Sequence, residues 1–379
     1  MKVLLVGEYS NLHNSLKEGL IALGHEVTLV STGDSFKNLS TDHSIHASFT
    51  ESKIGNILFR FLRKIKILNL EKSEKALRFF FFIQKQKQFD CIQLINSNAI
   101  ESYPFINQWF YKQLLKKTKN LNLLVCGDEV PIVDFYLKNK NFYNILTPML
   151  EDESLKIHFS YPLKYTQKSY KKVFDFLKNH CNSIITSDFD YEIPMKKMGF
   201  KTHFIPNPIN CDKIVFNENK VTDKIVILLG INRFSYYKKG IVYFEQALKI
   251  IKEKYSDKVE IIISENVPYK EYVKIINKSH IVLDQIFAHD QGYNALTAMA
   301  QGKVVFTGAE KDWLQYFNLE ENNVAINALP NVEDIVSKLD FLINNPKKIE
   351  IIGKNTRKFI EKEHHYIQIA TKYLEAWSL

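Results

Sequence analysis

The sequence predicts an α/β protein made of two doubly wound, Rossmann-like domains that face each other across a cleft. Two observations carry this prediction. Short, continuous apolar runs of strand length alternate with amphipathic segments of helix length along the chain. The chain also has 379 residues, which is too long for one comfortable core and fits two domains of ordinary size.

The first alternation begins at residue 2. The run KVLLV predicts a strand that ends at Gly7, and residues 15–23 place Leu16, Leu20 and Leu23 on one face of a helix. Gly24 ends this helix before the strand EVTLV, so the three segments form a βαβ unit with a parallel sheet. Further strands are expected at CIQLI (91–95), NLLVC (122–126) and SIIT (183–186).

A second alternation follows a polar linker. Strands are expected at residues 224–230, 259–264, 281–287 and 303–308, with amphipathic helices at 240–255 and 269–279. We therefore expect an N-terminal domain at 1–206, a linker at 207–223 and a C-terminal domain at 224–360. Residues 361–379 are expected to form a helix that packs back toward the N-terminal domain.

Composition favours a globular protein with anionic partners. The apolar fraction is 45% and the charged fraction 25%, while the net charge of +9 favours phosphorylated ligands, acidic membranes or nucleic acid. The four cysteines lack metal-ligand spacing and are expected to be reduced core residues of a cytoplasmic protein. No apolar run approaches the ~20 residues that span a bilayer.

Ligands of open parallel sheets bind beyond the carboxyl ends of the strands, so the loops there are the places to look for a site. The loop after the first strand contains Gly7 but not the G-x-G-x-x-G pattern of dinucleotide binders. This loop is instead expected to line a cleft with its polar residues Glu8, Ser10, His13 and Asn14, of which His13 is a candidate catalytic residue. In the alternative, Asn14 or Ser15 caps the helix and His13 is a solvated loop residue.

A second loop, residues 124–131, places Asp128 and Glu129 after a buried strand and a glycine. This position suits a general base or a carboxylate that binds a hydroxyl group, and we select Asp128 as a catalytic candidate. The alternative is that these acidic residues cap the next helix.

The third loop, residues 230–240, carries Arg233 and Lys239 between a strand and a helix. A guanidinium, an ammonium and a helix N-terminus can converge there on a diphosphate. Gly240 is expected to let the backbone approach the ligand, whereas Lys238 is expected to be a solvated surface residue.

The fourth loop is HDQGYNALTAMAQGK, residues 289–303. Gly292 is expected to leave the edge of the sheet open to a ligand, and Asn294 is expected to be the N-cap of the next helix. Alanines let this helix lie close to the sheet, and Gly302 ends it in a left-handed conformation. The stretch thus predicts a cradle for an anion and a sugar.

These residues together resemble a GT-B glycosyltransferase, most closely the family 4 and group 1-like bacterial enzymes that use nucleotide sugars. Arg233, Lys239 and Gly240 are similar to the residues that hold the donor diphosphate in that group. Ala298, Met299, Ala300 and Gly302 match the second half of its late signature, NPIN at 207–210 resembles its linker motif, and GHEV at 24–27 fits the end of its first helix. The resemblance covers essentially the whole chain.

The resemblance also implies roles for residues of the late signature, with two departures. The two glutamates of the family fall on His289 and Thr297. Asp290, one residue away, is the candidate to replace the first glutamate, and Thr297 would offer a hydroxyl to the nucleotide ribose. The residues expected at the donor are Arg233, Lys239, Gly240, Gly292, Tyr293, Asn294 and Thr297.

The resemblance implies sugar transfer from a nucleoside-diphosphate sugar to a hydroxyl acceptor, as in cell-surface glycan biosynthesis. It also implies that the acceptor lies against the N-terminal domain, which makes Glu8, Ser10 and Asn14 the acceptor-side residues. It implies no cofactor beyond the donor and no metal; Asp188 and Asp190 form an Asp-x-Asp motif, but we interpret it as a helix cap. Two rivals stay open: an inactive nucleotide-sugar-binding partner protein that lacks the glutamate pair, and a sugar-nucleotide epimerase.

One segment bears on the acceptor. Residues 53–68 interleave lysines and arginines with large apolar residues, and ALRFFFFI follows at 76–83. A basic amphipathic helix of this kind rests on an anionic bilayer and would suit a lipid-linked acceptor. Buried apolar faces with snorkelling lysines give the same pattern. The aromatic residues are not arranged as a stacking platform, so nucleic acid is not expected as a partner.

Overall fold

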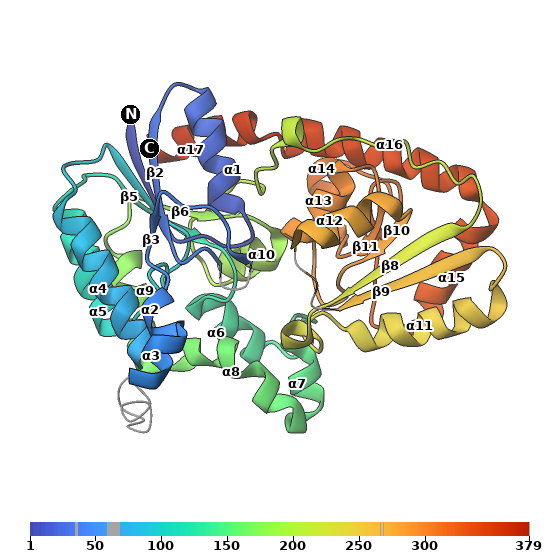
Figure 1. Ribbon diagram of the computed structural model, residues 1–379, viewed down its shortest axis with the longest axis horizontal. Coiled ribbons are helices and arrows are strands. Elements are labelled where there is room, and N and C mark those ends of the chain that lie inside the picture. Colours follow the sequence, from blue (N-terminus) through green and yellow to red (C-terminus); the bar gives the residue numbers. More distant parts are fainter. Residues whose placement is uncertain (35–36, 59–68, 266, 268, 379) are drawn as a thin grey trace.

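The computed structural model describes residues 1–34, 37–58, 69–265, 267 and 269–378. It contains two parallel β-sheets that lie side by side, each with helices packed against it (Figure 1). The predicted α/β architecture of two doubly wound, Rossmann-like halves is confirmed.

The first sheet has the strand order β3-β2-β1-β4-β5-β6-β7 and is parallel throughout. Its strands are β1 Lys2–Val6, β2 Glu26–Ser31, β3 His43–Ser44, β4 Cys91–Leu94, β5 Leu121–Val125, β6 Ser183–Thr186 and β7 His203–Phe204. Its helices are α1 Leu12–Ala22, α2 Ser48–Glu51, α3 Lys53–Leu58, α4 Leu70–Gln84, α5 Pro104–Leu115, α6 Val130–Lys138, α7 Thr147–Glu151, α8 Ser160–Leu163, α9 Lys168–Lys178 and α10 Phe189–Lys197. The short 3-10 helices are η3 Glu153–Phe159 and η4 Lys164–Thr166.

The second sheet has the order β12-β11-β10-β8-β9 and is also parallel. Its strands are β8 Ile225–Ile231, β9 Val259–Glu265, β10 Ile281–Leu283, β11 Val304–Thr307 and β12 Ile326–Asn327. Its helices are α11 Ile241–Lys254, α12 Tyr269–Lys278, α13 Tyr293–Ala300, α14 Lys311–Phe317, α15 Val332–Asn344 and α16 Pro346–Glu363. The 3-10 helices η5 Cys211–Lys213 and η6 Arg233–Ser235 lie in the linker and after β8.

Each sheet has one switch point, where successive strands are added on opposite sides, and these points indicate where a ligand binds. The switch point lies between β1 and β4 in the first sheet and between β8 and β10 in the second. Loops after the strands that flank such a point diverge and leave room for a ligand. The relevant loops therefore follow β1, β4, β8 and β10, and three of them contain residues selected from the sequence.

The last helix, α17 Tyr366–Trp377, returns to the first half of the molecule (Figure 1). Ile369, Tyr373 and Trp377 belong to the same apolar core as β1. The contact with α1 is close, because a Cβ added at Gly19 would lie 2.3 Å from the carbonyl oxygen of Tyr366. The first core is thus completed by residues that follow the second sheet in the chain.

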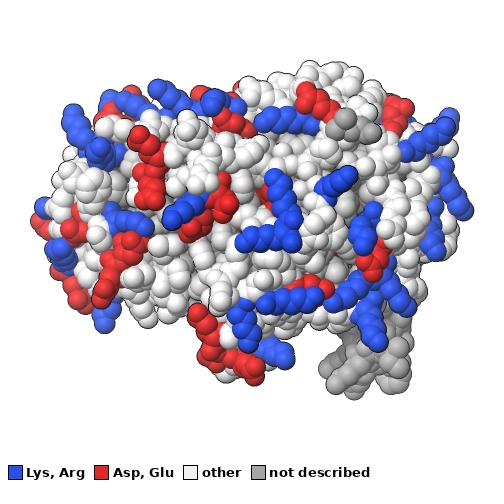
Figure 2. Space-filling model, turned by 180° about the vertical axis from the view of Figure 1, so that it is seen from behind, with Lys and Arg blue, Asp and Glu red and all other residues white. Residues whose placement is uncertain are grey.

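Positive charge is spread over the surface. On the face shown in Figure 2, Lys and Arg side chains lie over both halves of the molecule, in keeping with the net charge of +9. Within the described ranges, none of the helices combines the length and the apolar character needed to cross a bilayer.

Candidate functional site

The loops at the two switch points face each other and are joined by direct contacts. The Tyr293 hydroxyl, at the start of α13, lies 2.5 Å from the Ser15 hydroxyl and accepts a bond of 3.4 Å from the Asn11 amide. On the same crevice, the Lys238 ammonium lies 3.8 Å from the Asp128 carboxylate of the other half. The crevice between the halves is therefore lined from both sides by polar side chains.

Arg233 is placed in the loop after β8, as the sequence predicted, but its guanidinium is already occupied. It donates two parallel hydrogen bonds to Glu265 at the end of β9, at 2.9 and 2.6 Å. The Arg233 side chain is 53% exposed, so water screens this pair. An incoming phosphate can displace the carboxylate at little cost in free energy.

Lys239 contacts a buried acid at the end of β10. Its ammonium donates a 2.8 Å bond to Asp284, whose side chain is 1% exposed, and the Asn294 amide donates a second 2.8 Å bond to the same oxygen. The other Asp284 oxygen has no hydrogen-bond partner in the described residues. An ammonium carries three N–H donors, so Lys239 is oriented by Asp284 and keeps donors for a second anion.

One prediction in this half is wrong. Asn294 is not the N-cap of α13, because Gly292 occupies that position and the Asn294 amide bonds to Asp284. Gly240 is closely packed, because an added Cβ would lie 2.9 Å from Ile286. Its left-handed backbone, with a φ of 67°, starts α11. Gly302 is left-handed as predicted, with a φ of 82°.

The loop before α13 is less open than predicted. Residues 286–291 are all buried, whereas Gly292, Tyr293 and Asn294 are partly exposed. His289, at the position of the first family glutamate, stacks on Phe142 with the ring centres 4.3 Å apart, and its Nε2 lies 3.0 Å from the Tyr143 carbonyl oxygen. The accessible part of this loop therefore begins at Gly292.

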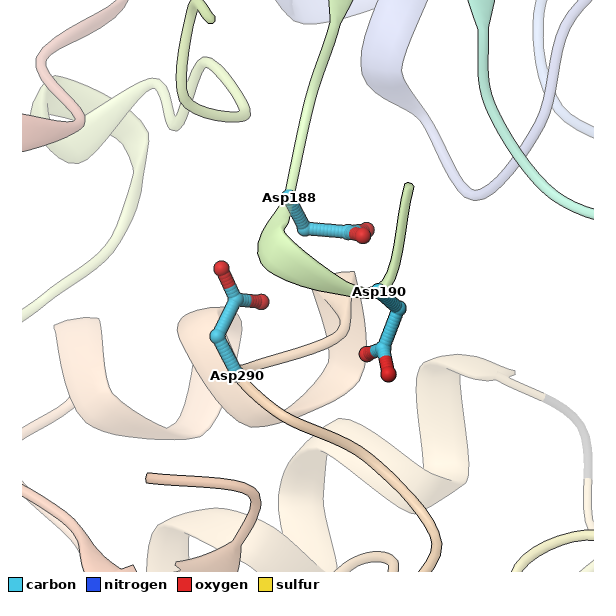
Figure 3. A group of neighbouring side chains, drawn as sticks. All are labelled: Asp188, Asp190 and Asp290. Carbon is cyan, nitrogen blue, oxygen red and sulfur yellow. The ribbon is translucent and has the colours of Figure 1, made fainter. Parts of the chain in front are cut away.

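Asp290, the predicted replacement for the first glutamate, is buried against α10. Its carboxylate accepts a 3.0 Å bond from the Phe189 N–H, and Asp190 accepts a 3.0 Å bond from the His289 N–H. Oxygens of Asp188, Asp190 and Asp290 lie within 4.8 Å of one another (Figure 3). Burial, together with the neighbouring carboxylates, raises the pKa of Asp188 and Asp290 well above the ordinary range.

This cluster ties the two halves together. Figure 3 shows Asp188 and Asp190 at the start of α10 and Asp290 opposite them, on the loop from the second sheet. Asp188 lies at the N-cap position of α10, as the helix-cap interpretation of the Asp-x-Asp motif expects, but its side chain forms no capping hydrogen bond. Because Asp290 and Asp190 accept backbone N–H groups across the interface, the arrangement favours a structural role over contact with the donor sugar.

Thr297, at the position of the second family glutamate, lines a cavity. Its hydroxyl donates a 2.8 Å bond to the Tyr293 carbonyl oxygen of its own helix. The cavity has a volume of about 340 Å³ and is lined by residues of α1, α12, α13 and the linker, among them Ser15, Asn210, Asn277, Tyr293, Thr297 and Gln301. A polar cavity of this size beside α13 has room for part of a nucleotide.

Two of the acceptor-side residues are buried inside the first half. Glu8 and His13 are fully buried, so the prediction that they line the cleft is wrong. His13 Nδ1 donates to the Gly7 carbonyl oxygen at 2.7 Å, and burial lowers its pKa to about 4. Burial raises the pKa of Glu8 to about 8, against the opposing effect of the Asn14 N–H that it accepts.

Asn14 and Ser10 bind within their own half. The Asn14 amide donates to Glu8 at 2.9 Å and does not cap α1, which begins after Asn11. Ser10 donates its N–H to Asp34 at 2.8 Å and accepts a bond from Lys37 at 2.9 Å. Of the four predicted residues, Ser10 is the one that stays partly exposed beyond the strand end.

Asp128 lies in the crevice, as predicted, and Lys238 is not the surface residue that the sequence suggested. The side chains are 9% and 12% exposed, and the ion pair crosses from one half to the other. Burial raises the pKa of Asp128, while Lys238 and then Lys164 oppose this effect. Asp128 is therefore a carboxylate with two cations nearby, whereas Glu129 is bound to Ser97 and to its own helix N-terminus.

Sequence reasoning missed several residues of the crevice. Glu101 follows β4, accepts bonds from Thr32 and Lys75, and stands at the switch point of the first sheet. Lys164 and Tyr161 come from η4 and α8, which lie outside the loops after strands. The rule that ligands bind beyond the carboxyl ends of strands points to Glu101 once β4 is placed. The same rule does not predict site residues that lie on helices.

Comparison with known proteins identifies the fold. Residues 239–375 match the family described as glycosyl transferase-like. Sucrose-phosphate synthase from Thermosynechococcus elongatus superposes with a TM-score of 0.61 at 14% identity, covering 100% of this chain and 98% of that chain. HepE from Anabaena, solved with UDP and glucose, gives a TM-score of 0.58 at 11% identity, covering 100% and 99%.

A third solved structure has the same architecture but a different described activity. A protein from Listeria monocytogenes, proposed to be a UDP-N-acetylglucosamine 2-epimerase, gives a TM-score of 0.52 at 11% identity and covers 98% of this chain and 94% of that chain. No curated protein sequence matches the chain. The fold predicted by the resemblance is confirmed: the chain has the GT-B fold of these glycosyltransferases, and its residues 239–375 match the model of the glycosyl transferase-like family.

Proposed function

We propose that this protein transfers a sugar from a nucleoside-diphosphate sugar to an acceptor hydroxyl held against the first half. The observation that carries the proposal is the pair of cationic side chains at the second switch point, Arg233 and Lys239, beside the partly exposed start of α13. The departing diphosphate must be neutralised, and cations and N–H groups at a helix N-terminus do this.

The residues divide between donor and acceptor. Arg233, Lys239 and the α13 residues Tyr293 and Thr297 would hold the donor diphosphate and ribose. Asp128, in the opposite wall, would accept a hydrogen bond from the acceptor hydroxyl and receive its proton. HepE was solved with UDP-glucose, which supports a nucleotide sugar as the donor type. We propose cell-surface glycan assembly as the setting.

A nucleotide-sugar panel tests this proposal. Purified protein is incubated with UDP-, GDP-, ADP- and CMP-sugars, and both the free nucleotide and the remaining sugar nucleotide are measured. Release of nucleoside diphosphate with at least one donor is expected. A changed sugar in an intact nucleotide sugar would identify an epimerase and overturn the transferase.

A second candidate, a nucleotide-sugar-binding protein without turnover, is favoured by one observation. His289 and Thr297 stand where the family has two glutamates. His289 is buried against Phe142, and the Thr297 hydroxyl bonds within its own helix, so neither takes the place of a glutamate carboxylate at the donor. Tight binding of a nucleotide sugar in calorimetry with no chemical change over hours would establish this candidate.

Membrane contact and cellular place are further proposals. Of the basic segment 53–68, residues 59–68 lie outside the described residues. Phe80 and Phe81 of α4 are exposed, at 36% and 55%, which supports contact with a lipid surface. Sedimentation with anionic liposomes should show salt-sensitive binding, and its absence would contradict membrane contact. The four free cysteines support a reducing compartment such as the cytoplasm.

A further inference from the structure

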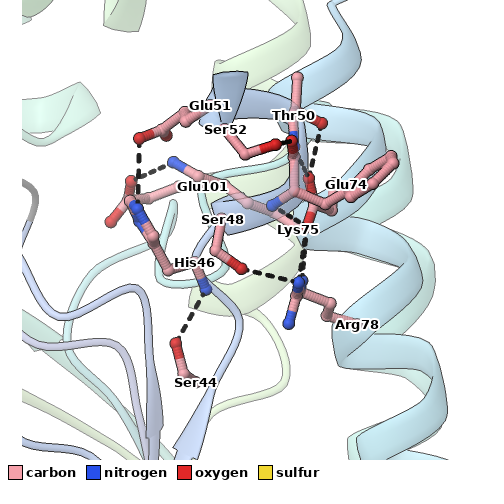
Figure 4. Close-up of polar contacts among 11 residues, drawn as sticks. Ser44, His46, Ser48, Thr50, Glu51, Ser52, Glu74, Lys75, Arg78 and Glu101 are labelled. Atoms are coloured by element: carbon pink, nitrogen blue, oxygen red, sulfur yellow. Dashed lines mark hydrogen bonds and ion pairs between the residues drawn. The ribbon is translucent and has the colours of Figure 1, made fainter. Parts of the chain in front are cut away.

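Two lysines of α4, Lys72 and Lys75, lie near Lys164 in the first half of the crevice, and Lys164 also interacts with the predicted catalytic residue Asp128. Lys75 of α4 is bound to Glu101 at 2.9 Å (Figure 4). The Lys164 ammonium lies over the ring of Tyr161, 3.4 Å from its centre, and the Lys72 ammonium lies over Tyr103 at 5.7 Å. In the part of the chain that the structure describes, Lys72 and Lys164 form no ion pair with a carboxylate.

The charges of this region do not balance. Four lysines face it from α4, η4 and the loop after β8: Lys72, Lys75, Lys164 and Lys238. Asp128, Glu101 and Glu129 are the acids that interact with Lys164; the first two pair with Lys238 and Lys75, and Glu129 accepts bonds from Ser97 and Val130. Four lysines therefore face three acids, and the ammonium groups of Lys72 and Lys164 rest on aromatic rings in a partly buried place.

Holding uncompensated ammonium groups there costs free energy. Burial, with a smaller contribution from the charges of Lys72 and Lys75, lowers the pKa of Lys164 to about 7 against the opposing effect of Asp128 and Glu101. Burial and then the charge of Lys75 lower the pKa of Lys72. A bound anion would reverse this cost, because charge-assisted hydrogen bonds are strongest where water is scarce.

We propose that Lys72 and Lys164 form a subsite for a negatively charged group of the acceptor, best fitted by a phosphate ester. Compact ammonium groups that act as point charges suit a tetrahedral oxyanion, whereas a planar carboxylate is better matched by arginine. The inference rests on the proposed function, because Asp128 beside the subsite would receive the acceptor hydroxyl. It adds to that function the chemical class of the acceptor.

Calorimetry with a sugar phosphate tests the subsite. Glucose 6-phosphate, glucuronate, glucose and inorganic phosphate are titrated into protein saturated with UDP, so that the donor site does not compete for anions. Glucose 6-phosphate is expected to bind at least about tenfold more tightly than glucose, and more tightly than glucuronate. Equal affinities for glucose 6-phosphate and glucose, or no binding of any anion, would overturn the proposal.

Matched variants locate the binding. Lys164→Gln and Lys72→Gln should each weaken glucose 6-phosphate binding about tenfold. Lys164→Arg keeps the charge and should retain most of the affinity. Lys112→Gln is the control, because the Lys112 ammonium also lies over an aromatic ring, 5.7 Å from the centre of Phe176, but on α5 outside the crevice. Wild-type affinity in Lys164→Gln would remove Lys164 from the site.

A pH series separates this charge effect from a structural one. Glucose 6-sulfate keeps a constant charge between pH 6 and 9 at the sulfate group, so any change in its affinity comes from the protein. Affinity should fall as the pH rises past the pKa of Lys164, since only the protonated amine attracts the anion, and Lys164→Gln should lose this slope. The same slope in the variant would contradict the proposal.

The experiment also distinguishes the two proposals from each other. Titration of UDP alone reports on the second half of the crevice, and titration of glucose 6-phosphate without nucleotide reports on the first half. Absent UDP binding with retained sugar-phosphate binding would reject the donor role and leave the subsite standing. The reverse result would reject the subsite and leave the transferase proposal intact.

Discussion

The crevice has one wall in each half of the molecule, and the cationic side chains of the two walls have different partners. In the second half, Arg233 and Lys239 each bind a carboxylate of their own half, Glu265 and Asp284. In the first half, Lys72 and Lys164 rest on aromatic rings. Paired cations are held in a fixed geometry and exchange one anion for another, whereas unpaired cations gain their first anion on binding. The comparison predicts different responses when each wall is altered.

The largest effect is expected at the buried pair of the second wall. Lys239→Met removes a phosphate ligand and leaves Asp284 buried with one neutral donor, so UDP affinity should fall at least about tenfold and the free energy of unfolding by about 2 kcal/mol. Calorimetry and chemical denaturation measure the two. The double variant Lys239→Met, Asp284→Asn should regain stability but not affinity. Wild-type UDP affinity in Lys239→Met would show that the lysine serves only Asp284.

The exposed pair of the same wall should separate binding from stability. Arg233→Ala should weaken nucleoside diphosphate binding about tenfold with little change in unfolding temperature, because solvent-exposed pairs contribute little to stability. Glu265→Gln is the matched control, since it releases Arg233 and should leave affinity equal or higher. An unchanged dissociation constant in Arg233→Ala would take Arg233 out of the site.

The contact between the walls, Lys238 with Asp128, predicts a shift in pH dependence. Lys238 lowers the pKa of Asp128, so Lys238→Met should raise it. If Asp128 acts as the base, activity rises as Asp128 loses its proton, and the acidic limb of the pH–rate profile should move to higher pH in the variant. Profiles of kcat/KM from pH 5 to 9 measure this. If the acidic limb stays at the same pH in Lys238→Met, a group other than Asp128 is responsible for it.

The aspartate cluster predicts a smaller effect on stability. The pKa of Asp188 is raised in the folded protein, so the folded state binds more protons than the unfolded state, and stability falls as the pH rises above the ordinary aspartate value of 3.8. Asp188→Asn should therefore raise the unfolding temperature at pH 8 and gain less near pH 5. Asp340→Asn should lose stability instead, because Lys254 lowers the pKa of Asp340. A loss of stability at pH 8 in Asp188→Asn would argue that its charge is needed.

The smallest expected effect is that of a chelator. If cations of the second wall neutralise the diphosphate, transferase activity should survive EDTA. The cluster of Asp188, Asp190 and Asp290 makes this a sharp test, because three carboxylates within 4.8 Å resemble a cation site. A strict manganese requirement, together with loss of the manganese-dependent activity in Asp188→Asn, would identify the cluster as a metal site and contradict metal independence.

Much of the fold was predictable because parallel strands buried on both faces appear as continuous apolar runs. KVLLV became β1, and Gly302 ends α13 in the expected conformation. The placement of Asp128, Arg233 and Lys239 also follows, since each lies in a connection between a strand and the next α-helix. These predictions depend on the local order of the chain.

What failed depends on contacts between distant segments. The sequence predicted a solvated Lys238, but in the folded protein Asp128 of the first half lies beside its ammonium. Asn294 suited a helix cap, but the buried Asp284 competes for its amide. His13 and Glu8 are polar residues inside the first half, and nothing in a single sequence distinguishes them from residues that line a cleft. The roles assigned to donor and acceptor residues stay predictions.

The return of α17 to the first half has a consequence for synthesis. The Trp377 indole donates a 2.7 Å bond to Gln93 of β4, and the Asn120 amide donates to the Trp377 carbonyl oxygen at 2.6 Å. Domains usually fold in the order in which the ribosome produces them. Here the first half leaves the ribosome without α17, and its core is completed only after the second half has been translated. A nascent chain stalled before Tyr366 would therefore expose the apolar surface that α17 covers, and chaperones could bind it.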